Sequence, residues 1–139
     1  MNILLEQAQH LANNLSFAFE TPTGIPHNGI WVNNRTIDDN DINGLAAVGS
    51  LVLEWTRLSD LTGDQTYARL AERAESYLLD PQPASSGPWP GLVGGSINIT
   101  SGEFDGALGG WAGGTDSFYE YLLKMYVYDS SRFGYYLDR

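Results

Sequence analysis

The stretch "LAAVGSLVLEWTRLSDLTGDQTYARLAERAESYLLDP" (Leu45–Pro81) predicts two helices joined by a tight turn. Its first half, up to about Leu61, repeats apolar residues at the spacing of one helix face. The positions that we expect to be buried there are Val48, Val52, Trp55 and Leu58. In the segment "LTGD", Gly63 suits the end of this helix and Asp64 can cap the next one.

The second helix of the stretch also has an apolar face. Its apolar residues, spaced as on one side of a helix, are Tyr67, Leu70, Ala71, Ala74 and Leu78. This helix is expected to end at Asp80, because the residue before a proline avoids the helical conformation. Two amphipathic helices with a short connection bury their apolar faces by packing together, so the stretch predicts a helical hairpin.

The remaining sequence adds further helices and one long connection. Helices are predicted from Met1 to about Phe19, from near Ser117 onward, and at the start of "SRFGYYLDR". Ser117 is the expected N-cap of its helix, since a glutamate follows at capping-box spacing. The segment from Pro81 to Gly110 is rich in Pro, Gly and Ser, and its pieces "LVGGSINIT" and "GEFDG" are compatible with a small β-hairpin. We therefore predict an all-α fold of helical hairpins with long Gly/Pro-rich loops.

Composition excludes several classes of function. The 139 residues suffice for one domain, and 17 acidic against 7 basic residues give a formal net charge of −10, which disfavours nucleic acid as a partner. The absence of cysteine excludes thiol catalysis and thiolate metal sites. No apolar run approaches the roughly 20 residues of a membrane span, and the N-terminus lacks the apolar run of a signal peptide. Three N-glycosylation patterns, at Asn14, Asn34 and Asn98, give a weak indication of secretion.

The segment "GGWAGGTDSFYEYLLK" (Gly109–Lys124) places one acid, Asp116, where a glycine-rich loop becomes a helix. An acid at that position interacts favourably with the helix dipole, and position alone favours this structural role. A second interpretation is a sugar site, because glycines let a ligand approach the backbone and aromatic rings pack on sugars. The rings concerned are Trp111, Phe118, Tyr119 and Tyr121, and core packing is the simpler interpretation for most of them.

Three blocks of the chain resemble glycoside hydrolase family 47, the class I α-1,2-mannosidases. They are "FETPTGIP" (Phe19–Pro26), "GSLVLEWTRLSDLTGDQTY" (Gly49–Tyr67) and "GGTDSFYEYLLKMYVYD" (Gly113–Asp129). The resemblance implies an (α/α)7 barrel and a calcium-dependent enzyme that trims α-1,2-linked mannose from N-glycans with inversion at the anomeric carbon. It also implies a place in the secretory pathway, in the endoplasmic reticulum or Golgi, where members can be membrane-attached, or secretion from the cell.

Residue by residue, the resemblance assigns a catalytic role to Asp116, which falls on the acid of the family motif D-S-[FY]-Y-E-Y. Whether Asp116 serves as acid or base stays open. Gly114 occupies the position where members of the endoplasmic-reticulum type carry a substrate-contacting arginine. The implied pocket is therefore wider, and we expect the intact enzyme to remove several mannoses.

Two further positions bear on substrate binding. Glu54, in "LEW", follows the family pattern and is a candidate for substrate binding, although a structural hydrogen bond is the simpler role for a helix-borne acid. At Ala47 the family usually has a glutamate that helps to bind substrate, so "LAAVGS" has lost a carboxylate. This loss puts substrate affinity in question.

The resemblance covers about a third, or less, of a family catalytic domain. The block with the general acid, the further glutamates and the threonine that holds calcium have no counterpart in residues 1–139. We therefore interpret residues 1–139 as an internal fragment with an incomplete barrel and no metal ligands of its own. Alone, it is expected to be inactive.

Three hypotheses compete at this stage. The chain is part of a mannosidase acting on high-mannose N-glycans, a degenerate lectin-like relative that binds mannose without cleaving it, or a helical-repeat scaffold. Ala47 favours the second hypothesis. The third lacks support, because no second copy of the helical unit recurs at a period near 34 residues.

Overall fold

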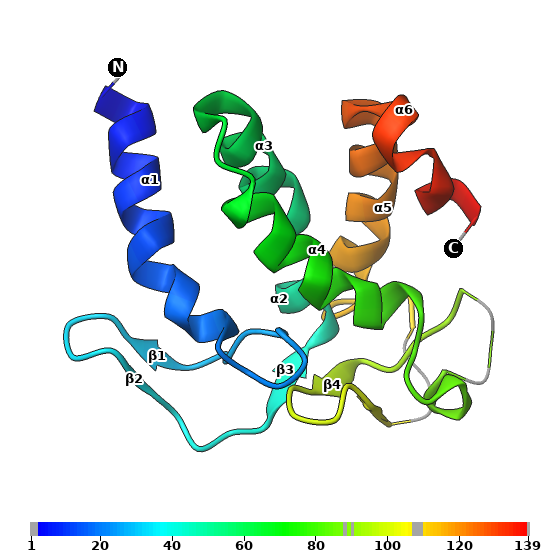
Figure 1. Cartoon of the computed structure of the whole chain (residues 1–139). Helices are drawn as coiled ribbons and strands as arrows, with labels where there is room; N and C mark the ends of the chain where they lie inside the picture. The colour runs from blue at the N-terminus through cyan, green and yellow to red at the C-terminus, as the bar shows by residue number, and fades with distance from the viewer. Residues whose placement is uncertain (1–2, 88, 90, 107–109, 139) are drawn as a thin grey trace.

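In a computed structural model, the chain forms helices that stand side by side, with short strands gathered at one end of them (Figure 1). The structure describes residues 3–87, 89, 91–106 and 110–138. The helical elements are α1 (Ile3–Leu15), η1 (Ser16–Phe19), α2 (Leu45–Gly49), α3 (Val52–Thr62), α4 (Thr66–Leu79), η2 (Ala84–Ser86), α5 (Asp116–Tyr128), α6 (Ser130–Phe133) and η3 (Gly134–Asp138). The strands are β1 (Ile30–Trp31), β2 (Thr36–Ile37), β3 (Ile42–Gly44), β4 (Ser96–Asn98) and β5 (Phe104–Asp105).

The hairpin predicted from Leu45–Pro81 is present as α3 and α4. Gly63 ends α3 in the left-handed conformation, with φ of 80°, and its N–H donates to the Ser59 carbonyl at 2.8 Å. Asp64 accepts a hydrogen bond from the Thr66 N–H at 2.9 Å, so it satisfies the first N–H of α4 as a capping side chain does, although Gln65 holds the N-cap position. The helix ends at Leu79, directly before Asp80 and Pro81. The turn and its flanking caps therefore act as their residue types require.

The predicted helix over Leu45–Leu61 is wrong in one respect, because it is broken into α2 and α3. Gly49 and Ser50, both poor helix formers, stand at the break. Gly49 also lies against α5: a Cβ built on it would be 2.5 Å from Cδ2 of the buried Phe118. The glycine thus lets α2 and α5 approach closely, and helix continuity is lost at that point.

We expect Gly49→Ala to lower the free energy of unfolding by about 1–3 kcal/mol, because the added methyl group overpacks the contact with Phe118. Denaturant unfolding of the complete catalytic domain measures this effect. Gly134→Ala is the matched control, since Gly134 has helical backbone angles and nothing within 4 Å of an added Cβ. Equal unfolding midpoints for the two variants would contradict the prediction.

The predicted buried positions are largely confirmed. Those found buried are Val48, Val52, Leu58, Tyr67, Ala71, Ala74 and Leu78, whereas Trp55 and Leu70 are half-buried. The main core lies where the helices meet the sheet, and Leu45, Ile97 and Phe118 all belong to it. This core ties the strand-bearing end of the molecule to the helices.

The small hairpin predicted between Pro81 and Gly110 is confirmed as β4 and β5, which pair antiparallel with Ile97 opposite Phe104. Sequence reading missed β3, which pairs with the other edge of β4 and places Asn43 opposite Ile97. It also missed the two-stranded sheet of β1 and β2. Because β3 leads directly into α2, the sheet fixes where α2 begins.

Helix predictions at the two ends of the chain need small corrections. The first helix is α up to Leu15 and closes with a 3₁₀ turn to Phe19, while Met1 lies outside the described residues. The helix expected near Ser117 starts at Asp116, so Ser117 is not its N-cap; Thr115 holds that position. The expected fifth helix is the short α6 followed by η3.

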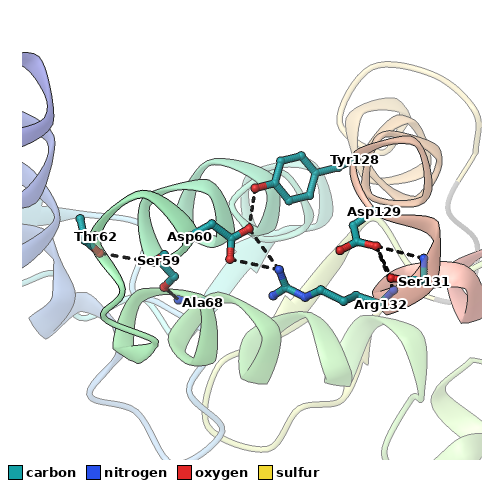
Figure 2. A network of polar contacts seen from close by, with 8 residues as sticks. All are labelled: Ser59, Asp60, Thr62, Ala68, Tyr128, Asp129, Ser131 and Arg132. Atoms are coloured by element: carbon teal, nitrogen blue, oxygen red, sulfur yellow. Dashed lines mark hydrogen bonds and ion pairs between the residues drawn. The ribbon is translucent and has the colours of Figure 1, made fainter.

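The end of the helices opposite the sheet is held by a polar network (Figure 2). Asp60 of α3 accepts hydrogen bonds from the Tyr128 hydroxyl at 2.6 Å and from Nη1 of Arg132 at 3.1 Å to each carboxylate oxygen. Asp129 caps α6 by accepting from the N–H groups of Ser131 and Arg132. Hydrogen bonds, that from the Ser131 side chain foremost, lower the pKa of Asp129. The network thus joins α3 to α5 and α6.

Candidate active site

Asp116 is the first residue of α5, and its side chain is exposed. Its Oδ1 accepts a hydrogen bond from the Ser117 N–H at 2.9 Å, and its own N–H donates to the Ala112 carbonyl at 3.2 Å. The carboxylate therefore interacts with the helix start and faces solvent at the same time. Both roles considered for this acid are compatible with its position.

Thr115 fixes the loop that leads to Asp116. It is buried, and its hydroxyl lies within hydrogen-bonding distance of the carbonyls of Gly110 and Ala112. Its N–H also donates to Ala112, at 3.1 Å. Sequence reading missed this residue, although a threonine directly before a helix is a common N-cap and was the available signal.

Gly114 connects this loop to α2. It has φ of +98°, a conformation that favours glycine, and its carbonyl accepts a hydrogen bond from the Ala46 N–H at 3.0 Å. The neighbouring Leu45 N–H donates to the Gly95 carbonyl, next to β4, at 3.0 Å. The first two free N–H groups of α2 are thus satisfied by the loop and by the sheet segment. Space around Gly114 is open, with nothing within 4 Å of a Cβ built on it.

Ala47 lies one residue beyond this junction, on the exposed side of α2. With Leu51 and Trp55 it lines a cavity that also borders His27 and Asn28. The hydrogen bond from Ala46 joins the start of α2 to the loop with Gly114, but the cavity that Ala47 lines includes neither Gly114 nor Asp116. That these residues belong to one substrate site stays a prediction.

Glu54 lies on α3 and is exposed. Its Oε1 accepts a hydrogen bond from the Tyr121 hydroxyl at 3.0 Å, and burial together with this carboxylate raises the pKa of Tyr121. Tyr121 stands five residues after Asp116, about 7.5 Å further along the helix axis. Glu54 therefore has the structural hydrogen bond considered from the sequence, and contact with substrate stays a prediction.

The rings near Asp116 have different roles. Phe118 is 3% exposed and belongs to the core, as core packing predicts. Trp111 is exposed and stacks on Tyr119, with 4.6 Å between ring centroids and 21° between planes. The Tyr119 hydroxyl in turn accepts a hydrogen bond from the Val93 N–H at 3.4 Å.

The described part of the chain holds neither a metal-binding cluster nor a membrane-spanning helix. Within it, no three His, Asp or Glu side chains come together in a group that could hold a metal ion. Across the same residues, no helix has the length and apolar character to cross a bilayer.

Comparison with known proteins gives consistent matches. The family model of glycosyl hydrolase family 47 matches residues 1–139. A mannosyl-oligosaccharide α-1,2-mannosidase of Penicillium citrinum is 60% identical over 136 residues, which cover 98% of this chain and 27% of that protein. The Aspergillus phoenicis mannosyl-oligosaccharide α-1,2-mannosidase 1B is 58% identical over 139 residues, covering all of this chain and 27% of that protein.

A solved structure is similar to this chain over nearly the whole chain. The α-1,2-mannosidase from Trichoderma reesei superposes with a TM-score of 0.92 at 51% identity, over 99% of this chain and 28% of that one. The helical hairpins and small sheet thus correspond to part of the (α/α)7 barrel of that enzyme, and the fold expected from the resemblance is confirmed. The chain spans little more than a quarter of the length of these relatives.

Proposed function

Since the chain belongs to glycosyl hydrolase family 47, we propose that it forms part of the catalytic domain of a glycosidase that removes α-1,2-linked mannose from N-glycans. One observation carries the proposal. Asp116 is an exposed carboxylate at the start of a helix, held by a closed glycine-rich loop, in a fold that matches an α-1,2-mannosidase closely. Residues 1–139 would be an internal part of this domain.

We propose an inverting reaction in which Asp116 is one of the two carboxyl groups. Inversion requires one carboxylic acid that protonates the leaving oxygen and one carboxylate that activates water, about 6.5–9.5 Å apart. Asp116 is suited to either task, because its carboxylate faces solvent while its backbone is fixed by Ala112. The partner carboxyl group is expected outside this chain, so residues 1–139 alone are expected to be inactive.

Calcium enters the proposal through the family resemblance. The described residues do not fit a calcium site, since they include no cluster of acidic or histidine side chains that could hold the ion. The threonine that holds calcium is expected in another part of the catalytic domain. The roles proposed for Asp116 and Glu54 rest on their own carboxylates and not on the ion.

Substrate range and location are further parts of the proposal. The open space at Gly114 supports a pocket wide enough for several successive cleavages of a high-mannose N-glycan. Glu54 would contribute to substrate binding through the solvent-exposed part of its carboxylate. A secretory location, in the endoplasmic reticulum or Golgi or outside the cell, is supported by the glycosylation pattern at Asn34, which lies exposed in the turn between β1 and β2.

The test is release of mannose from a high-mannose N-glycan by the 139-residue chain and by the complete catalytic domain, each with and without a calcium chelator. We expect release by the complete domain with calcium, loss of release with the chelator, and none by the shorter chain. Release that continues at full rate in the chelator would contradict the calcium requirement. Cessation after a single cleavage would contradict the wide pocket.

A second candidate function is mannose binding without cleavage. The observation that favours it is Ala47, which is exposed at the start of α2 where the family resemblance implies a substrate-binding glutamate. A complete domain that binds a high-mannose glycan in calorimetry but releases no mannose would support this function over the hydrolase.

A further inference from the structure

One aromatic pair beside Asp116 has no role in the core. Trp111 exposes 73% of its surface, an unusually large fraction for the largest apolar side chain. Its indole ring nevertheless has a defined position, because it stacks on Tyr119 at 4.6 Å with the two planes 21° apart. One face of the indole is therefore covered by Tyr119, and the opposite face is free for a ligand.

Tyr119 is itself held from two sides. Its hydroxyl accepts the Val93 N–H at 3.4 Å, and its ring contacts the buried Phe118 with 5.2 Å between centroids. The stacked pair thus rests on the core, and Trp111 requires little further ordering when a ligand binds. Such preorganisation reduces the entropy cost of binding.

The pair is continuous with the candidate active site. Ala112, the residue after Trp111, accepts hydrogen bonds from the N–H groups of Thr115 and Asp116 at 3.1 and 3.2 Å. The same short turn therefore carries the exposed indole at one end and the exposed carboxylate at the other. A glycan bound at Asp116 would extend over this turn.

We propose that Trp111, backed by Tyr119, is a stacking platform for one mannose ring of the bound N-glycan. This inference rests on the proposed function and adds a specific substrate-binding residue to it. A pyranose presents a face of C–H groups that packs on an aromatic ring, and it is neutral, so the net charge of −10 does not oppose its binding.

The surroundings of Trp111 favour a single sugar ring over a protein segment. The three residues that follow Trp111, Ala112, Gly113 and Gly114, are exposed but small, so they add no large apolar side chain beside the indole. By contrast, the groove between α1 and α3 is lined by several large apolar side chains, among them Leu5, Leu53 and Leu58, as a packed helix requires. The platform matches a sugar ring in size.

The experiment measures steady-state kinetics of the complete catalytic domain on a high-mannose N-glycan. Trp111→Ala is expected to raise KM about tenfold, with kcat within about twofold, because a binding contact is lost and the reacting groups are kept. Trp111→Phe, which retains an aromatic face, is expected to stay within about threefold of the wild type. Trp31→Ala is the matched control, since Trp31 is 56% exposed but lies in β1, which stands apart from α5 and its first residue Asp116 (Figure 1).

A second readout does not depend on catalysis. In the Asp116→Asn background, addition of the glycan is expected to change the tryptophan fluorescence, and Trp111→Phe should abolish most of that change. An unchanged KM in Trp111→Ala, or an increase equal to that of Trp31→Ala, would overturn the platform. The platform would also be overturned if acrylamide did not quench the fluorescence of Trp111 in the ligand-free domain, because another part of the protein would then cover the indole. If the wild-type domain released no mannose, the proposed function itself would fail.

Discussion

Asp116→Asn in the complete catalytic domain is expected to lower kcat for mannose release by about 10²–10⁴-fold while leaving the melting temperature nearly unchanged. Asparagine keeps an oxygen that can accept the hydrogen bond from the Ser117 N–H, so the interaction with the start of α5 is preserved. It cannot gain or lose a proton at neutral pH, so acid or base catalysis is lost. The substitution therefore separates the two roles considered for this carboxylate.

Asp64→Asn provides the matched control for this prediction. Asp64 is also exposed and also accepts an N–H at a helix start, that of Thr66 at 2.9 Å, but it lies at the turn between α3 and α4. Its replacement is expected to leave kcat unchanged. If Asp116→Asn retained full activity, or lost activity only in proportion to a fall in melting temperature, Asp116 would be a structural residue.

Local signals in the sequence were sufficient to predict the α3–α4 hairpin. Gly63 adopts the left-handed conformation that its place after an apolar face suggested, and Pro81 ends α4 through steric exclusion at Asp80. Such effects act within a few residues, so they can be read without knowledge of the fold. The same holds for the β4–β5 hairpin, whose short β-like pieces lie close together in the chain.

The larger errors involve contacts between distant segments, whereas the N-cap and helix-end corrections are local. The break between α2 and α3 occurs where Gly49 meets Phe118 of α5, and β3 exists because it pairs with β4, more than fifty residues later. Composition at Ile42–Gly44 contains no strong strand signal, since pairing rather than propensity determines that strand. The family resemblance compensated for this limit in the fold, because it supplied the arrangement of the hairpins, which is confirmed, while the role that it implies for Asp116 stays a prediction.

A buried acid, Glu75, was also missed. It is 1% exposed on α4, and the Tyr136 hydroxyl donates a hydrogen bond to its Oε2. Its Oε1 has no hydrogen-bond partner among the described residues. The sequence contains a signal for this burial. Glu75 stands four residues after Ala71, which stands four residues after Tyr67, so its carboxylate falls on the apolar face of the helix.

Burial raises the pKa of Glu75 to about 8, and the nearby Glu72 adds to the effect, while the Tyr136 hydrogen bond opposes it. The ionised carboxylate of Glu75 is not stabilised by the nearby cation Arg132. This arginine of α6 forms an ion pair with Asp60 and influences the pKa of Glu72. In the unfolded chain the carboxyl returns to its ordinary pKa of 4.5. Between these two values the folded protein binds a proton that the unfolded chain does not.

The sign of the pH dependence follows from this difference. The contribution of Glu75 to stability is fully present below pH 4.5, decreases by up to about 1.4 kcal/mol per pH unit above it, and is lost once the pH passes about 8. Glu75→Gln, which is neutral at every pH, removes this term. At pH 8.5 the variant is expected to be more stable than the wild type by up to about 5 kcal/mol, whereas near pH 4.5 the two should be similar.

Urea unfolding of the complete domain between pH 4.5 and 8.5 measures the difference in stability. The calcium concentration is kept constant and saturating, because a bound ligand would otherwise add its own pH-dependent stabilisation. Glu6→Gln, a substitution of an exposed glutamate on α1, is the control and should leave the curve of the wild type unchanged. Parallel stability curves for Glu75→Gln and the wild type would mean that Glu75 ionises normally in the folded protein. A curve for Glu75→Gln that depends less on pH than that of the wild type is the expected result, and it would show that Glu75 stays protonated in the folded protein up to high pH.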